Sequence, residues 1–460
     1  DLIIFIGSIA ASIRIINSFL TSKDQDPGVI VIDNKCSKIV PLIGLHQSNT
    51  QNIACQIANL LGGEIIETNN SNDQSLLNLD AFGNQWGWKR SGKINDWSKL
   101  VIKQAKNEEI FCKQLSGNSL WKTSESAEII NQIDKKETEK PDSTFHVSIF
   151  ENHGTTWHPP VLWIGIGCER NTSKELIANS LNNFLESGNL SQQSIAGFAT
   201  IDIKKDEKGI LELSEEKNLP IKFFSKEDLS TIIVPNPSNV VQKEIGTPSV
   251  AEASCLLAAG EESKLLEEKR IFKNQSGAVT IAVAESKNQY NPTHGEIHII
   301  GSGPGDISFL TNNARKALSR CTVWIGYKMY LDLIKPLKRN DQVLIESKLT
   351  EEKERCSKAI KLAEEGIKVA LISSGESGFY GMAGLLLELL QKIKKEYRPY
   401  FEVHPGISSV QLAAAISGAP LMNDFCSVSL SDKLTPWSLI EKRIEGALVG
   451  DFVIALFNPQ

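Results

Sequence analysis

Closely spaced cysteines are missing from this sequence. Its 460 residues contain eight cysteines, and none of them stands in a C-x-x-C pair. Disulfide frameworks and structural zinc sites both depend on closer, recurring cysteine spacings. We therefore expect isolated, buried thiols in a reducing cytoplasm and no metal site built on cysteine.

Long hydrophobic runs and an excess of basic charge are also missing. The apolar stretch from Leu2 to Ile13 ends at Arg14 and is much shorter than the ~20 residues of a membrane span. No basic segment precedes it, which argues against a signal peptide. Lysine and arginine number 49 against 55 aspartate and glutamate residues, a net charge of −6. This balance excludes a broadly basic nucleic-acid-binding surface, and we expect neither nucleic acid nor a membrane as a partner.

The chain is long enough to build a large core. At roughly 150 residues per domain its length predicts about three domains, and 41% hydrophobic with 23% charged residues is typical of a globular protein. Two polar stretches interrupt the apolar pattern, at 116–160 and at 286–295. The first contains a charge run and ends in His158-Pro-Pro, so we interpret it as a linker or irregular insert. The predicted domains are therefore 1–115, 161–285 and 295–460.

Each predicted domain alternates apolar strands with helices. The first begins with a buried strand at 2–6, a turn at Gly7 and a helix at 8–20. In the second, a helix at 172–186 lies between strands at 161–166 and 195–203. In the third, helices, the clearest at 351–365 and 382–394, separate strands at 297–300, 322–326, 343–345, 369–373, 401–404 and 451–457. This alternation predicts an α/β fold with largely parallel sheets, whose ligands bind at the carboxyl ends of the strands.

The strongest motif is Gly301-Ser-Gly-Pro-Gly-Asp306, directly after the strand predicted at 297–300. A dinucleotide fingerprint needs a third glycine where this chain has Asp306, and Pro304 lacks the N–H that a phosphate cradle uses. No Gly-Lys-Ser/Thr follows, so a nucleotide-triphosphate loop is excluded as well. A structural tight turn remains the alternative to a ligand site.

Two further motifs stand at predicted strand ends in the same domain. Ser373-Ser-Gly-Glu-Ser-Gly-Phe-Tyr-Gly-Met-Ala-Gly384 opens a long helix, and His404-Pro-Gly-Ile-Ser-Ser-Val410 leads into a helix of small residues. Glycines before a helix let the backbone approach a ligand and leave N–H and C=O groups free for it. Three such motifs in one domain favour a binding site over three unrelated turns.

Together with Gly326-Tyr327, these motifs resemble the tetrapyrrole methylase family. The segment 418–432 (GAPLMNDFCSVSLSD) and Leu434-Thr-Pro-Trp437 after it are similar to the precorrin-3B C-17 methyltransferase branch. The resemblance covers 295–460 and implies a two-lobed α/β module, usually a homodimer, that binds S-adenosylmethionine between its lobes and acts on a tetrapyrrole. Because the chain stops directly after the strand predicted at 451–457, we expect a truncated second lobe and no methyltransferase activity from this fragment alone.

The resemblance also implies site residues by motif position. The implied cofactor-binding residues are Pro304, Gly375, Glu376, Ser377, Tyr380, Ser408 and Ser409. Family members commonly have Gly-Asp-Pro where this chain has Gly-Glu-Ser, so the carboxylate is kept on a longer side chain. Asp306 is the candidate catalytic base or substrate-orienting group, with a helix-capping acid as the alternative. The candidates to receive substrate carboxylates are Lys328, Lys348 and Arg355.

The N-terminal half resembles the cobalt-precorrin-5A hydrolase family, which acts on the same macrocycle. The segments 165–173 (GIGCERNTS), 199–207 (ATIDIKKDE) and 246–253 (GTPSVAEA) are similar to its C-terminal domain. Residues 23–27 and His46 match its N-terminal part, which implies His46 as a catalytic base, with a structural histidine as the alternative. A candidate anion-binding turn consists of Cys168, Arg170 and Thr172. His153 and His158 have no third ligand nearby in the sequence, and we predict no metal site.

These patterns predict a cytoplasmic fusion enzyme of cobalamin biosynthesis. Its C-terminal part is expected to transfer a methyl group from S-adenosylmethionine to C-17 of a precorrin-3B or cobalt-precorrin-3 type tetrapyrrole, with ring contraction. Its N-terminal part is expected to be hydrolase-like. Two alternatives remain open, namely methylation at another corrin position and an N-terminal half that binds tetrapyrrole without catalysis.

Overall fold

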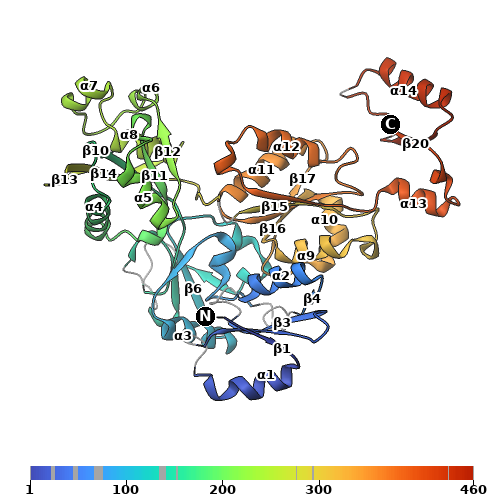
Figure 1. Ribbon diagram of the computed structural model, residues 1–460, viewed down its shortest axis with the longest axis horizontal. Coiled ribbons are helices and arrows are strands. Elements are labelled where there is room, and N and C mark those ends of the chain that lie inside the picture. The colour runs from blue at the N-terminus through green and yellow to red at the C-terminus, as the bar shows by residue number, and fades with distance from the viewer. Residues whose placement is uncertain are drawn as a thin grey trace. The chain divides into compact units, whose positions relative to one another are not determined.

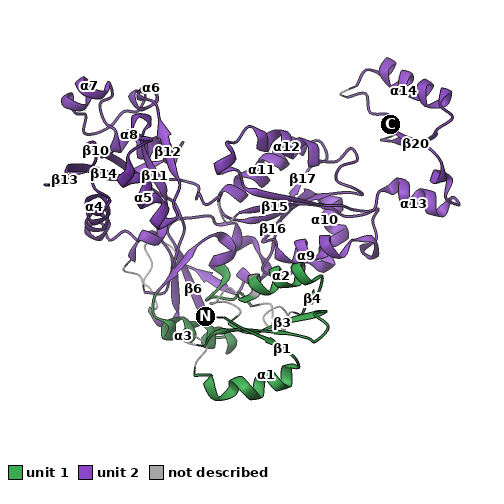
Figure 2. Cartoon of the chain, in the orientation of Figure 1, with its two compact units in different colours: residues 1–82, 92–108 green, residues 83–91, 109–460 purple. Residues whose placement is uncertain are grey.

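The computed structural model describes residues 2–21, 26–44, 50–66, 76–133, 141–151, 154–275, 277–292, 295–433 and 435–458. The chain divides into two compact units (Figure 2), residues 1–82 with 92–108 and residues 83–91 with 109–460. Strands and helices alternate in both units and form mixed and parallel sheets, which confirms the predicted α/β class. Among the described helices, none is long and apolar enough to span a bilayer.

The first unit contains a four-stranded sheet of order β1-β2-β3-β4. Its strands are β1 (Leu2–Ile6), β2 (Gly28–Ile32), β3 (Lys38–Ile43) and β4 (Glu64–Ile65). Its helices are α1 (Ile9–Ile16), α2 (Thr50–Leu61) and α3 (Ile94–Ala105). Val29 and Val31 pack with Ile16 of α1, while Ile30 and Ile32 pack with Ala54 of α2. Both faces of β2 are therefore buried under helices.

The first strand is less buried than the sequence predicts. Ile3, Ile4 and Ile6 are 41%, 49% and 65% exposed, although the apolar run predicted a buried strand. The prediction is wrong because β1 pairs only with β2 and forms the edge of its sheet. An edge strand has fewer neighbours to cover its side chains than a central one.

The predicted linker at 116–160 contains part of a five-stranded sheet of order β5-β9-β8-β6-β7. The strands are β5 (Lys89–Ser91), β6 (Ile110–Gln114), β7 (Ile130–Gln132), β8 (Thr144–Val147) and β9 (Thr156–His158). Trp121, Phe145 and Trp157 are at most 1% exposed, so an irregular linker is wrong for the described part of this stretch. Strands of three or four residues give almost no periodicity in a sequence, which is why polar composition concealed them.

Like the preceding sheet, a second sheet of order β12-β11-β10-β14-β13 belongs to the second unit. Its strands are β10 (Leu162–Cys168), β11 (Ile195–Ile201), β12 (Ile221–Phe224), β13 (Lys264–Asn274) and β14 (Gly277–Glu285). The helices are α4 (Lys174–Ser187), α5 (Lys208–Lys217), α6 (Lys226–Ser230), α7 (Asn239–Ile245) and α8 (Ala251–Ala259). The two predicted strands, β10 and β11, are parallel as expected, and β12, which was not predicted, runs parallel to β11. By contrast, β14 runs antiparallel to β10 and to β13. The Ser173 hydroxyl caps α4 by accepting from the Leu176 N–H, which confirms the predicted helix start.

The third sheet is entirely parallel, with the order β17-β16-β18-β15-β19 (Figure 1). Its strands are β15 (Glu296–Gly301), β16 (Val323–Tyr327), β17 (Val343–Ser347), β18 (Lys368–Ser373) and β19 (Tyr400–His404). In Figure 1, α11 (Glu352–Glu364) and α12 (Ala383–Gln391) lie on one face, with α9 (Asn312–Arg320) and α10 (Lys328–Ile334) on the other. Beyond β19 follow α13 (Ser409–Ile416), β20 (Phe425–Ser429), α14 (Trp437–Val449) and β21 (Val453–Phe457), and β20 pairs with β21 in parallel.

Gln289 lies in the polar segment predicted to separate two domains, and it is only 3% exposed. Its amide nitrogen donates to the carbonyls of Trp86 and Glu365, and its amide oxygen accepts from the Trp88 indole at 2.7 Å. The Glu365 carboxylate accepts from the Asn118 amide at 2.5 Å. The segment therefore binds neighbouring parts of the second unit to one another through buried hydrogen bonds.

Glu365→Gln should increase the free energy of unfolding at pH 8 by about 1–3 kcal/mol and change it little at pH 4. Burial raises the pKa of Glu365 to about 7, against an ordinary value of 4.5. The folded state therefore holds a proton that the unfolded chain has lost, and stability falls as the pH rises from about 4.5 through about 7. Glutamine keeps an acceptor for Asn118 without the buried charge.

Urea unfolding at the two pH values measures this effect. Glu354→Gln, which changes an exposed carboxylate on α11, is the matched control and should follow the wild type at both. An equal effect of Glu365→Gln at both pH values would contradict the assignment.

Candidate functional site

The three glycine-containing motifs leave adjacent strands at one edge of the third sheet. β18, β15 and β19 are neighbours and run parallel, with Gly301 paired to Ser373 and Ile300 paired to His404. The loops that follow these strands therefore begin side by side at their carboxyl ends. The predicted position of the motifs at strand ends is confirmed.

The backbones of these loops pack too closely for side chains between them. Gly303 and Gly375 exchange two backbone hydrogen bonds of 3.1 and 2.9 Å. A Cβ atom on Gly406 would lie 2.0 Å from the Gly375 carbonyl oxygen and 2.6 Å from that of Gly301. Gly375 also has a φ of +57°, a left-handed conformation that glycine adopts without a steric penalty. Glycine at 375 and 406 is therefore required by the conformation and packing of these loops.

Glu376 uses its carboxylate within its own loop. One oxygen accepts from the Gly378 N–H at 2.6 Å and the other lies 3.5 Å from the Ser377 hydroxyl. Ser377 is fully buried, whereas Tyr380 is 52% exposed. These contacts of the Glu376 carboxylate stabilise the loop that leads to the exposed Tyr380.

Tyr380 joins this loop to the sheet of β20 and β21. Its hydroxyl donates to the carbonyl of Ser427 on β20 at 3.1 Å, and its ring centroid lies 5.3 Å from that of Phe457 on β21. Tyr380 has a φ of +55°, which is uncommon for a residue with a side chain. The contacts with Ser427 and Phe457 stabilise Tyr380 in this conformation.

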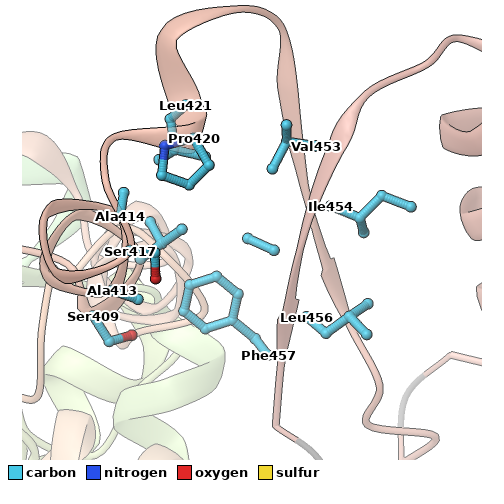
Figure 3. Close-up of a pocket in the computed structure, with 12 residues that line it drawn as sticks. Ser409, Ala413, Ala414, Ser417, Pro420, Leu421, Val453, Ile454, Leu456 and Phe457 are labelled. Atoms are coloured by element: carbon cyan, nitrogen blue, oxygen red, sulfur yellow. The ribbon is translucent and has the colours of Figure 1, made fainter.

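A groove of about 330 Å³ lies between α13 and β21 (Figure 3). Small residues line the side of α13, namely Ser409, Ala413, Ala414 and Ser417. On β21, the Phe457 ring points toward α13, while Ile454 and Leu456 point to the other side of the strand (Figure 3). A volume near 300 Å³ with apolar walls and a few hydroxyl groups is typical of a small-molecule site.

The predicted cofactor residues gather around this edge, but they are not equally placed. Ser409 lines the groove, and Tyr380 contacts Phe457 at its wall. Ser408 is buried and begins α13, where its backbone N–H donates to the Gln411 side chain at 2.8 Å. Pro304 is half-buried directly after the Gly303 bridge. The groove is thus bounded by α13, the loop that follows it and β21, and no residue of the first two motifs lines it.

Of the two predicted catalytic residues, only Asp306 lies among the described residues. Asp306 is exposed, and its carboxylate accepts from the Ser308 N–H at 2.7 Å at the start of a short 3-10 helix. This backbone hydrogen bond lowers the pKa of Asp306, and a carboxylate with a lowered pKa is a weaker base. His46 lies outside the described residues.

Of the three basic residues predicted to bind substrate carboxylates, Lys328 and Arg355 have partners within the chain and Lys348 is exposed. Lys328 pairs with Glu346 at 2.9 Å, and Lys348 is exposed. Arg355 is 4% exposed, and its guanidinium donates to the Ser347 hydroxyl and the Lys348 carbonyl, each at 2.7 Å. The prediction for Arg355 is wrong, because its guanidinium is buried and holds β17 to α11.

The turn after β10 is occupied by carboxylates of the chain itself. Arg170 donates to Asp206 at 2.6 Å, and the Asn171 N–H donates to Glu207 at 2.8 Å. Glu207 also pairs with Lys204 at 3.0 Å, and both side chains are less than 10% exposed. Burial raises the pKa of the Cys168 thiol to about 11, so the thiol is neutral near pH 7. Of the predicted anion-binding residues, Arg170 therefore binds Asp206, and the Thr172 hydroxyl donates to the Glu169 carbonyl at 2.9 Å.

His158 is buried, with one ring nitrogen 2.8 Å from the Ser148 carbonyl and the other 2.7 Å from the Ser91 hydroxyl. Both nitrogens thus have partners on neighbouring strands. His153, the other histidine of that sequence pair, lies outside the described residues.

The structure adds residues that the sequence did not single out. Ser427 and Phe457 meet Tyr380 across the groove, and His298, Glu402 and His404 form a cluster on β15 and β19. Glu402 and His404 stand two apart within a predicted strand, which places both side chains on one face. That spacing was the available signal for the cluster, whereas the partners of Tyr380 had none.

Comparison with known families divides the chain into matched segments. Residues 296–460 match the model of the tetrapyrrole (corrin/porphyrin) methylases. Residues 162–284 match the model described as cobalamin synthesis G C-terminus, and residues 1–72 match cobalamin synthesis G N-terminal.

Curated relatives repeat this division. The chain is 49% identical over 168 residues to a cobalt-factor III methyltransferase of Priestia megaterium, which covers 36% of this chain and 31% of the relative. It is 48% identical over 164 residues to a probable cobalt-factor III C(17)-methyltransferase of Salmonella typhimurium, covering 36% of this chain and 67% of the relative. A cobalt-precorrin-5A hydrolase of Priestia megaterium is 29% identical over 306 residues, 61% of this chain and 78% of the relative.

A solved structure of the methyltransferase CobJ shares 36% sequence identity, with a TM-score of 0.35 over 36% of this chain and 69% of that chain. The chain thus spans about a third of the length of the Priestia megaterium methyltransferase and about two thirds of the length of the Salmonella typhimurium relative.

Proposed function

The chain belongs to the tetrapyrrole methylase family, and from this we propose that it methylates C-17 of a cobalt-precorrin-3 or precorrin-3B type tetrapyrrole in cobalamin biosynthesis. The observation that carries the proposal is the junction of the three family motifs at one sheet edge, beside a groove of suitable size. The 48% identity to a probable cobalt-factor III C(17)-methyltransferase supports the C-17 position. Methylation at another corrin carbon is the alternative.

The residues around the groove fit S-adenosylmethionine, which supplies a methyl group on a sulfonium when it is bound. Small side chains on α13 and the apolar side of β21 leave room for a flat, partly apolar ligand. Glycine backbone at 375 and 406 brings carbonyl and N–H groups to the same edge without side chains in the way. We propose that the holding residues are Pro304, Gly375, Glu376, Ser377, Tyr380, Ser408 and Ser409.

The chain contributes mainly by positioning. Methyl transfer is an in-line displacement, and fixing both reactants supplies much of its rate. The Glu376 carboxylate and the hydrogen bonds between Gly303 and Gly375 fix the loops at the sheet edge, and Tyr380 contacts Ser427 and Phe457 of the sheet that forms one wall of the groove. We propose that Asp306 orients the substrate through its exposed carboxylate, because its lowered pKa makes it a weak base.

Tyr380→Phe should weaken the binding of S-adenosylmethionine about fivefold, the effect of losing one hydrogen bond worth about 1 kcal/mol. The phenol hydroxyl donates to the Ser427 carbonyl on β20, and its loss loosens the sheet of β20 and β21, whose strand β21 lines the groove. Isothermal titration with S-adenosylmethionine measures the change. Tyr330→Phe, on α10 of the same sheet, is the matched control and should bind as the wild type does. Equal affinity in Tyr380→Phe and wild type would contradict a bridging role.

For the N-terminal half we propose a cobalt-precorrin-5A hydrolase-like region fused to the methylase. His46 is the proposed base for lactone opening, and a tetrapyrrole-binding module without catalysis is the alternative. The test is lactone opening by the wild type and by His46→Ala. Opening that His46→Ala abolishes supports the hydrolase, and no opening by the wild type supports the binding module.

A tetrapyrrole is the proposed small-molecule partner. The homodimer, the cytoplasmic location and the domain boundaries at 115, 160 and 295 stay predictions. The methylase proposal is tested by incubating the complete protein with S-adenosylmethionine and cobalt-precorrin-3. Mass spectrometry should detect a tetrapyrrole heavier by one methyl group, and its absence would exclude the proposal.

A further inference from the structure

Two histidines and a glutamate meet on β15 and β19, on the sheet face that also carries Ile300. His298 Nδ1 lies 2.9 Å from His404 Nε2. A carboxylate oxygen of Glu402 lies 3.9 Å from His298 Nδ1 and 3.8 Å from His404 Nε2. His298 and Glu402 are paired across the two strands. Three potential ligand atoms from two adjacent strands therefore face one point.

A second carboxylate fixes the orientation of His298. Glu296 accepts from His298 Nε2 at 2.9 Å. The Glu296 carboxylate in turn pairs with Lys368 at 2.7 Å and with Arg320 at 3.4 Å. With Nε2 hydrogen-bonded to Glu296, Nδ1 is the ring nitrogen of His298 that faces His404. A carboxylate behind a ligating histidine is the usual outer partner in protein metal sites.

From this geometry we propose that His298 Nδ1, His404 Nε2 and Glu402 bind one divalent transition-metal ion of the zinc, cobalt or nickel class. Two imidazoles and a carboxylate are ligands that such ions accept. Tetrahedral coordination with metal–nitrogen bonds of about 2.0 Å needs ligand atoms about 3.3 Å apart. The two nitrogens would separate by about 0.4 Å and the carboxylate would approach by about 0.5 Å, shifts that side-chain rotation supplies.

The three proposed ligands differ in their exposure to solvent. The side chain of Glu402 is 47% exposed, while those of His298 and His404 are 1% and 8% exposed. An ion therefore enters from the side of Glu402, where water fills the fourth position. His404 directly precedes Pro405 and Gly406, so the ion would fasten the edge strand β19 to β15 where the third loop of the groove begins.

Metal binding by the complete apo-protein tests the proposal independently of methyl transfer. The probe is Co²⁺, followed by its visible d–d absorption, with Zn²⁺ bound after gel filtration measured by elemental analysis. The wild type should bind one ion per chain with the spectrum of nitrogen and oxygen ligands. Glu402→Gln should weaken binding at least tenfold, and His404→Leu should abolish it. Glu388→Gln, an exposed carboxylate on α12, is the matched control and should bind as the wild type does.

The outcomes separate the site from a plain hydrogen bond between two imidazoles. No binding by the wild type, a thiolate charge-transfer band, or equal binding by Glu402→Gln and wild type each overturns the proposal. Because Glu402 is half exposed, Glu402→Gln is expected to melt like the metal-free wild type. If His404→Leu does not fold, the comparison of metal binding between Glu402→Gln and the wild type tests the proposal by itself.

Discussion

Gly406→Ala is expected to cost about 3 kcal/mol or more of folding free energy and to abolish binding of S-adenosylmethionine. The added Cβ would lie 2.0 Å from the carbonyl oxygen of Gly375 and 2.6 Å from that of Gly301. Both obstacles are backbone atoms, which a side-chain rotation cannot move aside. The third loop must shift away from β15 and β18, and α13, which lines the groove, begins only three residues later.

Urea unfolding and titration with S-adenosylmethionine measure the two effects. Gly446→Ala is the matched control, because nothing lies within 4 Å of a Cβ placed on this glycine inside α14. That change should stabilise the helix by about 0.5–1 kcal/mol. Wild-type stability and affinity in Gly406→Ala would contradict the close packing of the three loops.

Glu207→Ala is expected to destabilise the second unit by about 3–5 kcal/mol. It leaves the Lys204 ammonium buried without its carboxylate partner, since the two side chains are 7% and 3% exposed and 3.0 Å apart. The Asn171 N–H loses its acceptor as well. An unpaired buried charge costs far more than the pair itself contributes, because the charge has lost its hydration.

The matched control is Glu216→Ala, which breaks an ion pair with Lys174 of similar length, 2.8 Å, at the surface. It should leave the urea midpoint almost unchanged, because water solvates the remaining charge. The double variant Lys204→Met with Glu207→Leu should recover most of the lost stability. Equal losses in Glu207→Ala and Glu216→Ala would contradict the buried pairing.

The sequence predicts the fold well where strands are central and fully buried. The runs at 297–300, 322–326 and 369–373 became β15, β16 and β18, the three strands of the third sheet that have parallel neighbours on both sides. It fails where burial is partial. The pairing of β13 with β14 was not predicted, because β13 mixes exposed and half-buried residues without a regular alternation. The strand β1 was predicted to be buried, but its apolar side chains lie on an exposed edge.

The sequence predicted the loops of the candidate site but not the residues that contact those loops. Glycines at strand ends carry a local signal, and the three motifs do meet at one edge. The contact of Tyr380 with Ser427 joins residues 47 apart in the sequence, and the buried guanidinium of Arg355 contacts Met382, 27 residues away. Whether a basic side chain is exposed or donates to a buried carbonyl depends on how such distant segments pack, which the sequence alone does not give.

The position of the transferred methyl group tests the proposed function most directly. The complete protein is incubated with cobalt-precorrin-3 and S-adenosylmethionine labelled with ¹³C in its methyl group, and the product is examined by NMR. The proposal predicts one labelled methyl group on C-17 of a ring-contracted tetrapyrrole. A label on another corrin carbon, or a product without label, would contradict it.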